Sequence, residues 1–323
     1  MVGVMRFAAN IPTAAGASEY STLAFCDSIS WEKQRSFARA TEAAGFDGLG
    51  VPDHLLAGDG ATTECFTTLT ALAGATESVT LFPKTVNNEL RHGPLLAKMA
   101  AEVDNVSDGR LKLGMGAGWK ADEALAYGYD WPDAPERLRA MEETIELTKR
   151  LWTEDEVEYD GDYYQLDGAA CRPRPRQDPR PPIMVGGGGE EFTLRIAAKH
   201  ADEWNFWGPT DVMAHKLDVL RSHCETYDTA FDDIDISWFA RCIVRETEAE
   251  VEAILDEVPR FRDPDPDDPM ASYNNLIGTP EQLVAELEPY AELGVDEVVL
   301  EFVDFPEATG VELFAEEVVP AFS

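Results

Sequence analysis

The chain has 323 residues with 62 acidic and 26 basic side chains, so its formal net charge is −36. A hydrophobic content of 44% excludes a disordered acidic tail. A negative field of this size repels phosphate backbones and anionic lipid headgroups, which excludes nucleic acid and membranes as partners. Because carboxylates dominate and Arg outnumbers Lys 18 to 8, we expect a folded, halophilic protein hydrated in concentrated salt.

The five Cys are scattered and never form a C-x-x-C pair, which indicates reduced thiols rather than disulfides or a zinc ribbon. The first residues lack the apolar stretch of a signal peptide, and no run approaches the ~18–20 apolar residues of a membrane span. We therefore expect a cytoplasmic protein.

Apolar, β-rich runs alternate with amphipathic stretches almost from end to end. The expected strands cover 4–10, 46–52, 79–86, 110–116, 182–186, 202–206, 235–244 and 296–302. The expected helices cover 31–44, 64–76, 94–107, 134–151, 190–200, 210–228, 247–259 and 280–293. Eight such repeats with continuous apolar strands predict an α/β fold, a single (β/α)8 TIM barrel over residues 1–323.

Two segments interrupt this alternation. Residues 153–181 predict an inserted hairpin followed by a Pro-rich approach to the fifth strand. Residues 261–272 are acidic and Pro-rich, and because no Gly supplies the turn of a calcium loop we expect a solvated surface loop there.

The common nucleotide and metal motifs are missing from the sequence. There is no phosphate-binding G-x-x-x-x-G-K-[ST] pattern, and the glycine run at 114–118 has Trp119 where a Rossmann fingerprint needs its last Gly. The five His show no ligand spacing, so no metal site is expected.

The ends of the expected strands carry the candidate chemistry, because barrel enzymes react at that face. Asp53 and His54 leave the second strand side by side and form the best acid–base pair, although such a pair is often structural. Gly116, Ala117 and Gly118 would let a flat ring lie against the fourth strand, or would serve close barrel packing. Trp119 would wall an apolar pocket or belong to the core.

A run of four glycines ends the fifth strand. Gly186, Gly187, Gly188 and Gly189 precede a helix that carries Thr193. Bare backbone N–H groups leading into a helix N-terminus bind anions such as phosphate, whereas a tight turn would need only one or two of these glycines.

Four segments together resemble the luciferase-like flavin/deazaflavin oxidoreductase superfamily, in particular an acidic, haloarchaeal-type member of its coenzyme F420-dependent branch. They are FDGLGVPDHL at 46–55 and the longer stretches at 90–131, 181–205 and 277–302. The resemblance covers nearly the whole chain and implies a barrel of the bacterial-luciferase type. It also implies a non-prolyl cis peptide around Lys84–Val86.

The same resemblance implies that the cofactor ring lies at the C-terminal mouth, with Asp53 and His54 near it as catalytic residues. The residues implied to hold the cofactor are Thr85, Val86, Asn88, Gly116, Ala117, Gly118, Trp119, Gly186, Gly187, Gly188, Gly189 and Thr193, with Arg91 as an addition. Trp119 stands where sugar-phosphate dehydrogenases of this family have Glu and where the methylenetetrahydromethanopterin reductases also have an acidic residue. This difference indicates a more apolar pocket.

The function expected from the resemblance is hydride transfer between coenzyme F420 and a small organic substrate, in a homodimer. An FMN-dependent monooxygenase is the alternative. A barrel lyase or hydrolase is a further alternative, but the sequence shows no Schiff-base Lys or metal cluster at the strand ends for such a reaction. A non-catalytic cofactor-binding protein is another, but it would not need the Asp53–His54 pair.

Overall fold

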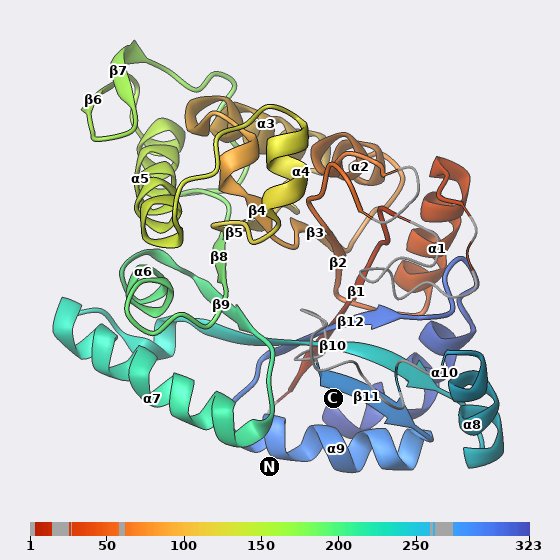
Figure 1. Cartoon of the computed structure of the whole chain (residues 1–323). Coiled ribbons are helices and arrows are strands. Elements are labelled where there is room, and N and C mark those ends of the chain that lie inside the picture. Colours follow the sequence, from red (N-terminus) through yellow and green to blue (C-terminus); the bar gives the residue numbers. More distant parts are fainter. Residues whose placement is uncertain (1–3, 15–25, 27, 58–61, 259–260, 262–273) are drawn as a thin grey trace.

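The computed structural model describes residues 4–14, 26, 28–57, 62–258, 261 and 274–323 (Figure 1). The strands are β1 (Arg6–Asn10), β2 (Gly48–Val51), β3 (Thr80–Pro83), β4 (Val86–Asn87), β5 (Leu113–Gly116), β6 (Val157–Asp160), β7 (Gln165–Ala169), β8 (Ile183–Gly186), β9 (Glu203–Phe206), β10 (Asp235–Val244), β11 (Asn274–Gly278) and β12 (Glu297–Phe302). The helices are α1 (Trp31–Ala43), α2 (Cys65–Ala73), α3 (Gly93–Val106), α4 (Ala121–Ala126), α5 (Ala134–Thr153), α6 (Thr193–His200), α7 (Thr210–Tyr227), α8 (Glu248–Glu257), α9 (Pro280–Glu292) and α10 (Thr309–Glu317).

The parallel strands form a nearly closed barrel with helices around it (Figure 1). Their order is β3-β2-β1-β12-β10-β9-β8-β5-β4, with β11 beside β10. A parallel bridge between Leu81 and Leu111 joins the two ends, where Leu81 donates to the Arg110 carbonyl at 2.8 Å. The expected α/β barrel is thus confirmed.

The third strand differs from its expected course. Residues 79–86 were expected to be continuous, but the strand breaks between β3 and β4 at a cis peptide between Lys84 and Thr85. A non-prolyl cis peptide is therefore present where the family resemblance implied one.

Three elements have no counterpart among the expected ones, namely α4, β11 and α10. The inserted hairpin is present as the antiparallel pair β6–β7, which projects beyond α5 (Figure 1). The acidic loop expected at 261–272 lies outside the described residues apart from Phe261. Within the described residues, no helix has the length and apolarity to cross a membrane, and no group of three or more His, Cys, Asp or Glu side chains could hold a metal ion.

Side chains that point into the barrel form layers, because every second residue of a strand faces inward. At the amino-terminal end of the strands, Lys112 Nζ lies 2.6 Å from a carboxylate oxygen of both Glu203 and Glu297. The next layer is apolar and is made of Ala8, Phe82, Met184, Phe239 and Val299, with Trp207 packed against it. The apolar layer separates the buried charges from the mouth.

The buried carboxylates predict a pH dependence of stability. Burial raises the pKa of Glu203 to about 7, with the Glu297 charge acting in the same direction and Lys112 opposing both. The folded chain then holds a proton that the unfolded chain has released, so stability falls as pH rises from about 4.5 to 7, by up to about 1.4 kcal/mol per pH unit. Urea unfolding at several pH values should show a shallower decline for Glu203→Gln. The exposed Glu317→Gln should keep the wild-type decline, and equal slopes for Glu203→Gln and the wild type would contradict the prediction.

Candidate functional site

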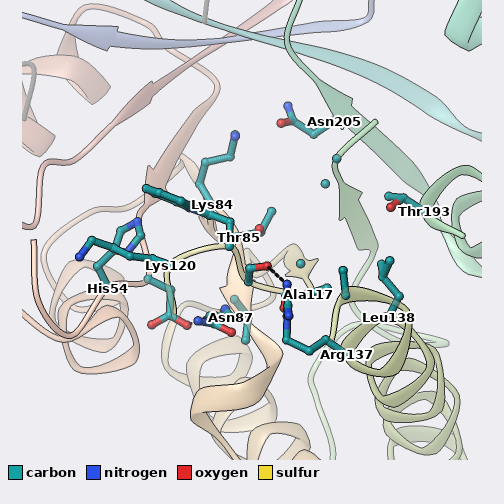
Figure 2. Close-up of a pocket in the computed structure, with 18 of the residues that line it drawn as sticks. His54, Lys84, Thr85, Asn87, Ala117, Lys120, Arg137, Leu138, Thr193 and Asn205 are labelled. Atoms are coloured by element: carbon teal, nitrogen blue, oxygen red, sulfur yellow. Dashed lines mark hydrogen bonds between the residues drawn. The ribbon is translucent and has the colours of Figure 1, made fainter. Parts of the chain in front are cut away.

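A cavity of about 330 Å³ opens at the carboxyl ends of the strands (Figure 2). Its wall comes from residues that follow β2, β3, β5, β8 and β9, together with parts of α4 and α5. The lining residues are Asp53, His54, Ala57, Lys84, Thr85, Val86, Asn87, Gly116, Ala117, Gly118, Trp119, Lys120, Glu123, Ala134, Arg137, Leu138, Gly186, Gly187, Thr193, Asn205 and Trp207. The volume is at the lower end of the range for small-molecule sites.

Asp53 borders this cavity, but its carboxylate is already engaged. Its side chain is fully buried, and Arg91 donates to both oxygens, at 2.5 and 2.9 Å. The backbone N–H of Asn87 donates to the same carboxylate at 2.9 Å. Arg91 in turn pairs with Glu64. Asp53 therefore ties the end of β2 to the segment after β4 and positions the neighbouring His54.

His54 is held by a residue that the sequence did not single out. Its Nδ1 lies 2.9 Å from Glu123 Oε1, and the other carboxylate oxygen of Glu123 accepts from the backbone N–H groups of Leu55 and Leu56. Glu123 lies on α4 and is fully buried, whereas about a quarter of the His54 side chain is exposed. The carboxylate fixes the ring and leaves Nε2 as the nitrogen that can exchange a proton with a ligand.

The turn after β5 forms a thin wall of the cavity. Gly118 has φ +73°, and a Cβ there would lie 2.2 Å from Asn87 Oδ1. Arg137 holds this turn from α5, donating to the Ala117 carbonyl at 3.0 Å (Figure 2). Close packing therefore favours glycine at position 118. Because glycine has no side chain, the backbone of this turn is open to a flat ligand.

The glycine run after β8 lies beside this turn, because β8 pairs with β5, and it leads towards Thr193. Gly187 has φ +120°, and a Cβ on Gly188 would lie 2.3 Å from the Phe206 ring, so packing accounts for part of the run. Phe192, which precedes α6, supplies no side-chain cap. The Leu194 N–H group donates to the Gly189 carbonyl at 2.9 Å, so an anion would be bound by the other first N–H groups of α6, assisted by the Thr193 hydroxyl.

Most of the residues expected at the site come together around the cavity. Asn88, Arg91, Gly188 and Gly189 do not line it. Asn88 lies instead in the short helix Asn88–Leu90, and Arg91 pairs with Asp53 and Glu64. The sequence interpretation did not select Lys84, Glu123 or Arg137. Glu123 and Arg137 lie on helices, whereas the candidates were taken from the ends of strands. The fold of the chain brings both residues to the mouth of the barrel.

The model of the family described as "Luciferase-like monooxygenase" matches residues 5–265. The chain belongs to the luciferase-like monooxygenase family. The Pseudomonas putida "FMNH(2)-dependent dimethylsulfone monooxygenase" is 28% identical over 98% of this chain and 94% of its own length. The "F420-dependent glucose-6-phosphate dehydrogenase" of Amycolatopsis mediterranei is 26% identical over 88% of this chain and 92% of its own length.

Two solved enzyme structures share this fold. An F420-dependent secondary alcohol dehydrogenase in complex with an F420-acetone adduct superposes with a TM-score of 0.81 at 19% identity, over 99% of both chains. The EDTA monooxygenase EmoA from Chelativorans sp. BNC1 superposes with a TM-score of 0.82 at 16% identity, over 99% of this chain and 93% of that one. The protein is thus a luciferase-like oxidoreductase of a family whose members use a flavin or a deazaflavin.

Proposed function

We propose that this protein transfers a hydride between coenzyme F420 and a small organic substrate. The observation that carries the proposal is the His54–Glu123 pair at the mouth of the cavity. When a hydride moves to or from a carbonyl carbon, a proton must move to or from its oxygen, and a fixed imidazole performs that step at neutral pH. The similarity to F420-dependent dehydrogenases supports the choice of F420 as the cofactor.

The residues around the cavity fit such a cofactor. The start of α6, which has no side-chain cap, and Thr193 offer donors for a phosphate, while the Gly116–Gly118 turn presents bare backbone to a flat ring. Both features border one cavity, at the ends of the neighbouring strands β5 and β8. A bound deazaflavin would supply the two-electron carrier.

The side chains around the cavity would then perform the proton transfer and hold the site in place. His54 Nε2 gives or takes the substrate proton, and Glu123 stabilises the protonated ring that results. Asp53 and Arg91 keep the end of β2 in place. Trp119 meets the His54 ring edge to face with centroids 5.8 Å apart and supplies an apolar wall.

An FMN-dependent monooxygenase is the second candidate, and the relative from Pseudomonas putida favours it. Oxygen separates the two functions, because hydride transfer by a deazaflavin proceeds without it. With reduced or oxidised F420 and a panel of small alcohols, aldehydes and ketones, we expect the deazaflavin absorption to change under strict exclusion of oxygen. Turnover that needs both FMNH2 and oxygen, with none from F420, would overturn the proposal.

The cofactor-binding side can be checked separately. Because a hydrogen bond to a charged group contributes about 1.5–3 kcal/mol, Thr193→Val should weaken cofactor binding about 10- to 100-fold. A fluorescence titration of the cofactor measures this change. An unchanged Kd would place the phosphate elsewhere.

A further inference from the structure

One cationic side chain at the floor of the cavity has no anionic partner among the residues that the structure describes. Lys84 follows Phe82 on the inward face of the third barrel strand, and its backbone N–H still donates to the Val51 carbonyl at 2.8 Å. Its side chain therefore lies one layer above the apolar interior, where it lines the cavity (Figure 2). Lys84 Nζ lies 4.5 Å from the centre of the Phe239 ring.

No carboxylate of the described residues lies within ion-pair distance of Lys84 Nζ, so none of them neutralises its charge in an ion pair. The Nζ instead contacts the aromatic face of Phe239. Burial lowers the pKa of Lys84 to about 8, with the charges of Glu301 and Glu203 opposing this change and that of Lys112 adding to it. The side chain is thus protonated at neutral pH, although its surroundings disfavour the charge.

The other cations that line the cavity are engaged differently, Lys120 by a carboxylate and Arg137 by backbone carbonyls. Lys120 Nζ lies 2.5 Å from Asp122, and Arg137 donates to the Ala117 and Pro132 carbonyls at 3.0 and 2.6 Å. Asn205, which also lines the cavity, has a buried Oδ1 without a hydrogen-bond partner, while its Nδ2 donates to Ser237 at 2.8 Å. The described floor of the cavity therefore offers one positive charge and one orphaned acceptor.

We propose that Lys84 binds the carboxylate of a small monoanionic substrate at the floor of the cavity. A single ammonium matches a single negative charge, whereas a phosphate dianion would need further donors that are already engaged. In a buried site this pairing is strong because little water screens it. The inference rests on the proposed function for the reaction, but the anion site itself can be tested without a cofactor.

Two pairs of matched probes test the site, namely benzoate with benzamide and propionate with propionamide. Ligand-detected NMR on the full chain without cofactor measures the four dissociation constants. We expect wild-type protein to prefer each carboxylate over its amide. Lys84→Met, whose thioether packs on Phe239, should raise the carboxylate Kd by about tenfold or more and leave the amide Kd unchanged. Lys84→Arg should keep the preference.

The pH dependence gives a second readout. Carboxylate affinity of the wild type should fall as pH rises through about 8, because the ammonium loses its proton, and this fall should vanish in Lys84→Met. Equal binding of acid and amide by the wild type, or an unchanged preference in Lys84→Met, would overturn the proposal. A loss of cofactor affinity in Lys84→Met with no change for the probes would overturn it too, because Lys84 would then hold the cofactor. If the protein prefers carboxylates but does not bind F420, the anion site at Lys84 is supported and the proposed function is wrong.

Discussion

Replacing His54 by asparagine is expected to lower turnover about 100- to 10,000-fold, the usual contribution of a positioned acid–base group. Asparagine can still donate to Glu123, so the fold and the buried carboxylate remain satisfied. Since His54 lines the cavity on the side away from Thr193, cofactor binding should not change (Figure 2). Steady-state kinetics together with a cofactor titration on the same variant measures both quantities.

Glu123→Gln is the matched comparison for this variant. It keeps the size of the side chain and an oxygen that accepts from the Leu55 N–H group, but it removes the charge next to the His54 ring. We expect a smaller loss of turnover than in His54→Asn, because the imidazole remains. Turnover at the wild-type level in His54→Asn would show that His54 does not transfer the substrate proton.

The second large effect concerns stability. Asp53→Ala should lower the free energy of unfolding by about 3–5 kcal/mol, because Arg91 would remain buried with one of its two carboxylate partners missing. The Asn87 N–H group would lose its acceptor as well. Urea unfolding followed by circular dichroism measures the change.

A double variant separates the buried charge from the general loss of packing. Asp53→Leu combined with Arg91→Met replaces the ion pair by apolar side chains, and should recover much of the stability lost in Asp53→Ala. If Asp53→Ala unfolds at the wild-type urea concentration, the Asp53–Arg91 pair does not stabilise the end of β2.

The barrel could be predicted because the eight expected strands each have a strong local signal, although β11 was missed. Continuous apolar runs separated by amphipathic stretches gave the order of elements, and the bounds of β8, β9 and β10 differ from expectation by at most one residue. Short elements with weak patterns were missed. The helix α4 has six residues, too few for a helical period to stand out, although it carries Glu123.

The site was predictable to the extent that it follows strand ends. Asp53, His54, the turn at Gly116–Gly118 and the glycines at 186–187 all line the cavity. The roles within it depend on contacts between distant parts of the chain. Arg91 reaches Asp53 from 38 residues away and Glu123 reaches His54 from 69 residues away, and no local pattern reports such pairings.

The choice of cofactor is the claim on which the proposed chemistry depends. A competition titration tests it most directly, with F420 and FMN offered to the same cofactor-free protein and each followed by its own absorption and fluorescence. We expect F420 to bind at least about tenfold more tightly, a difference of about 1.4 kcal/mol, and FMN not to displace it. Tight FMN binding with no response to F420 would contradict the proposed hydride transfer and point to the monooxygenase function.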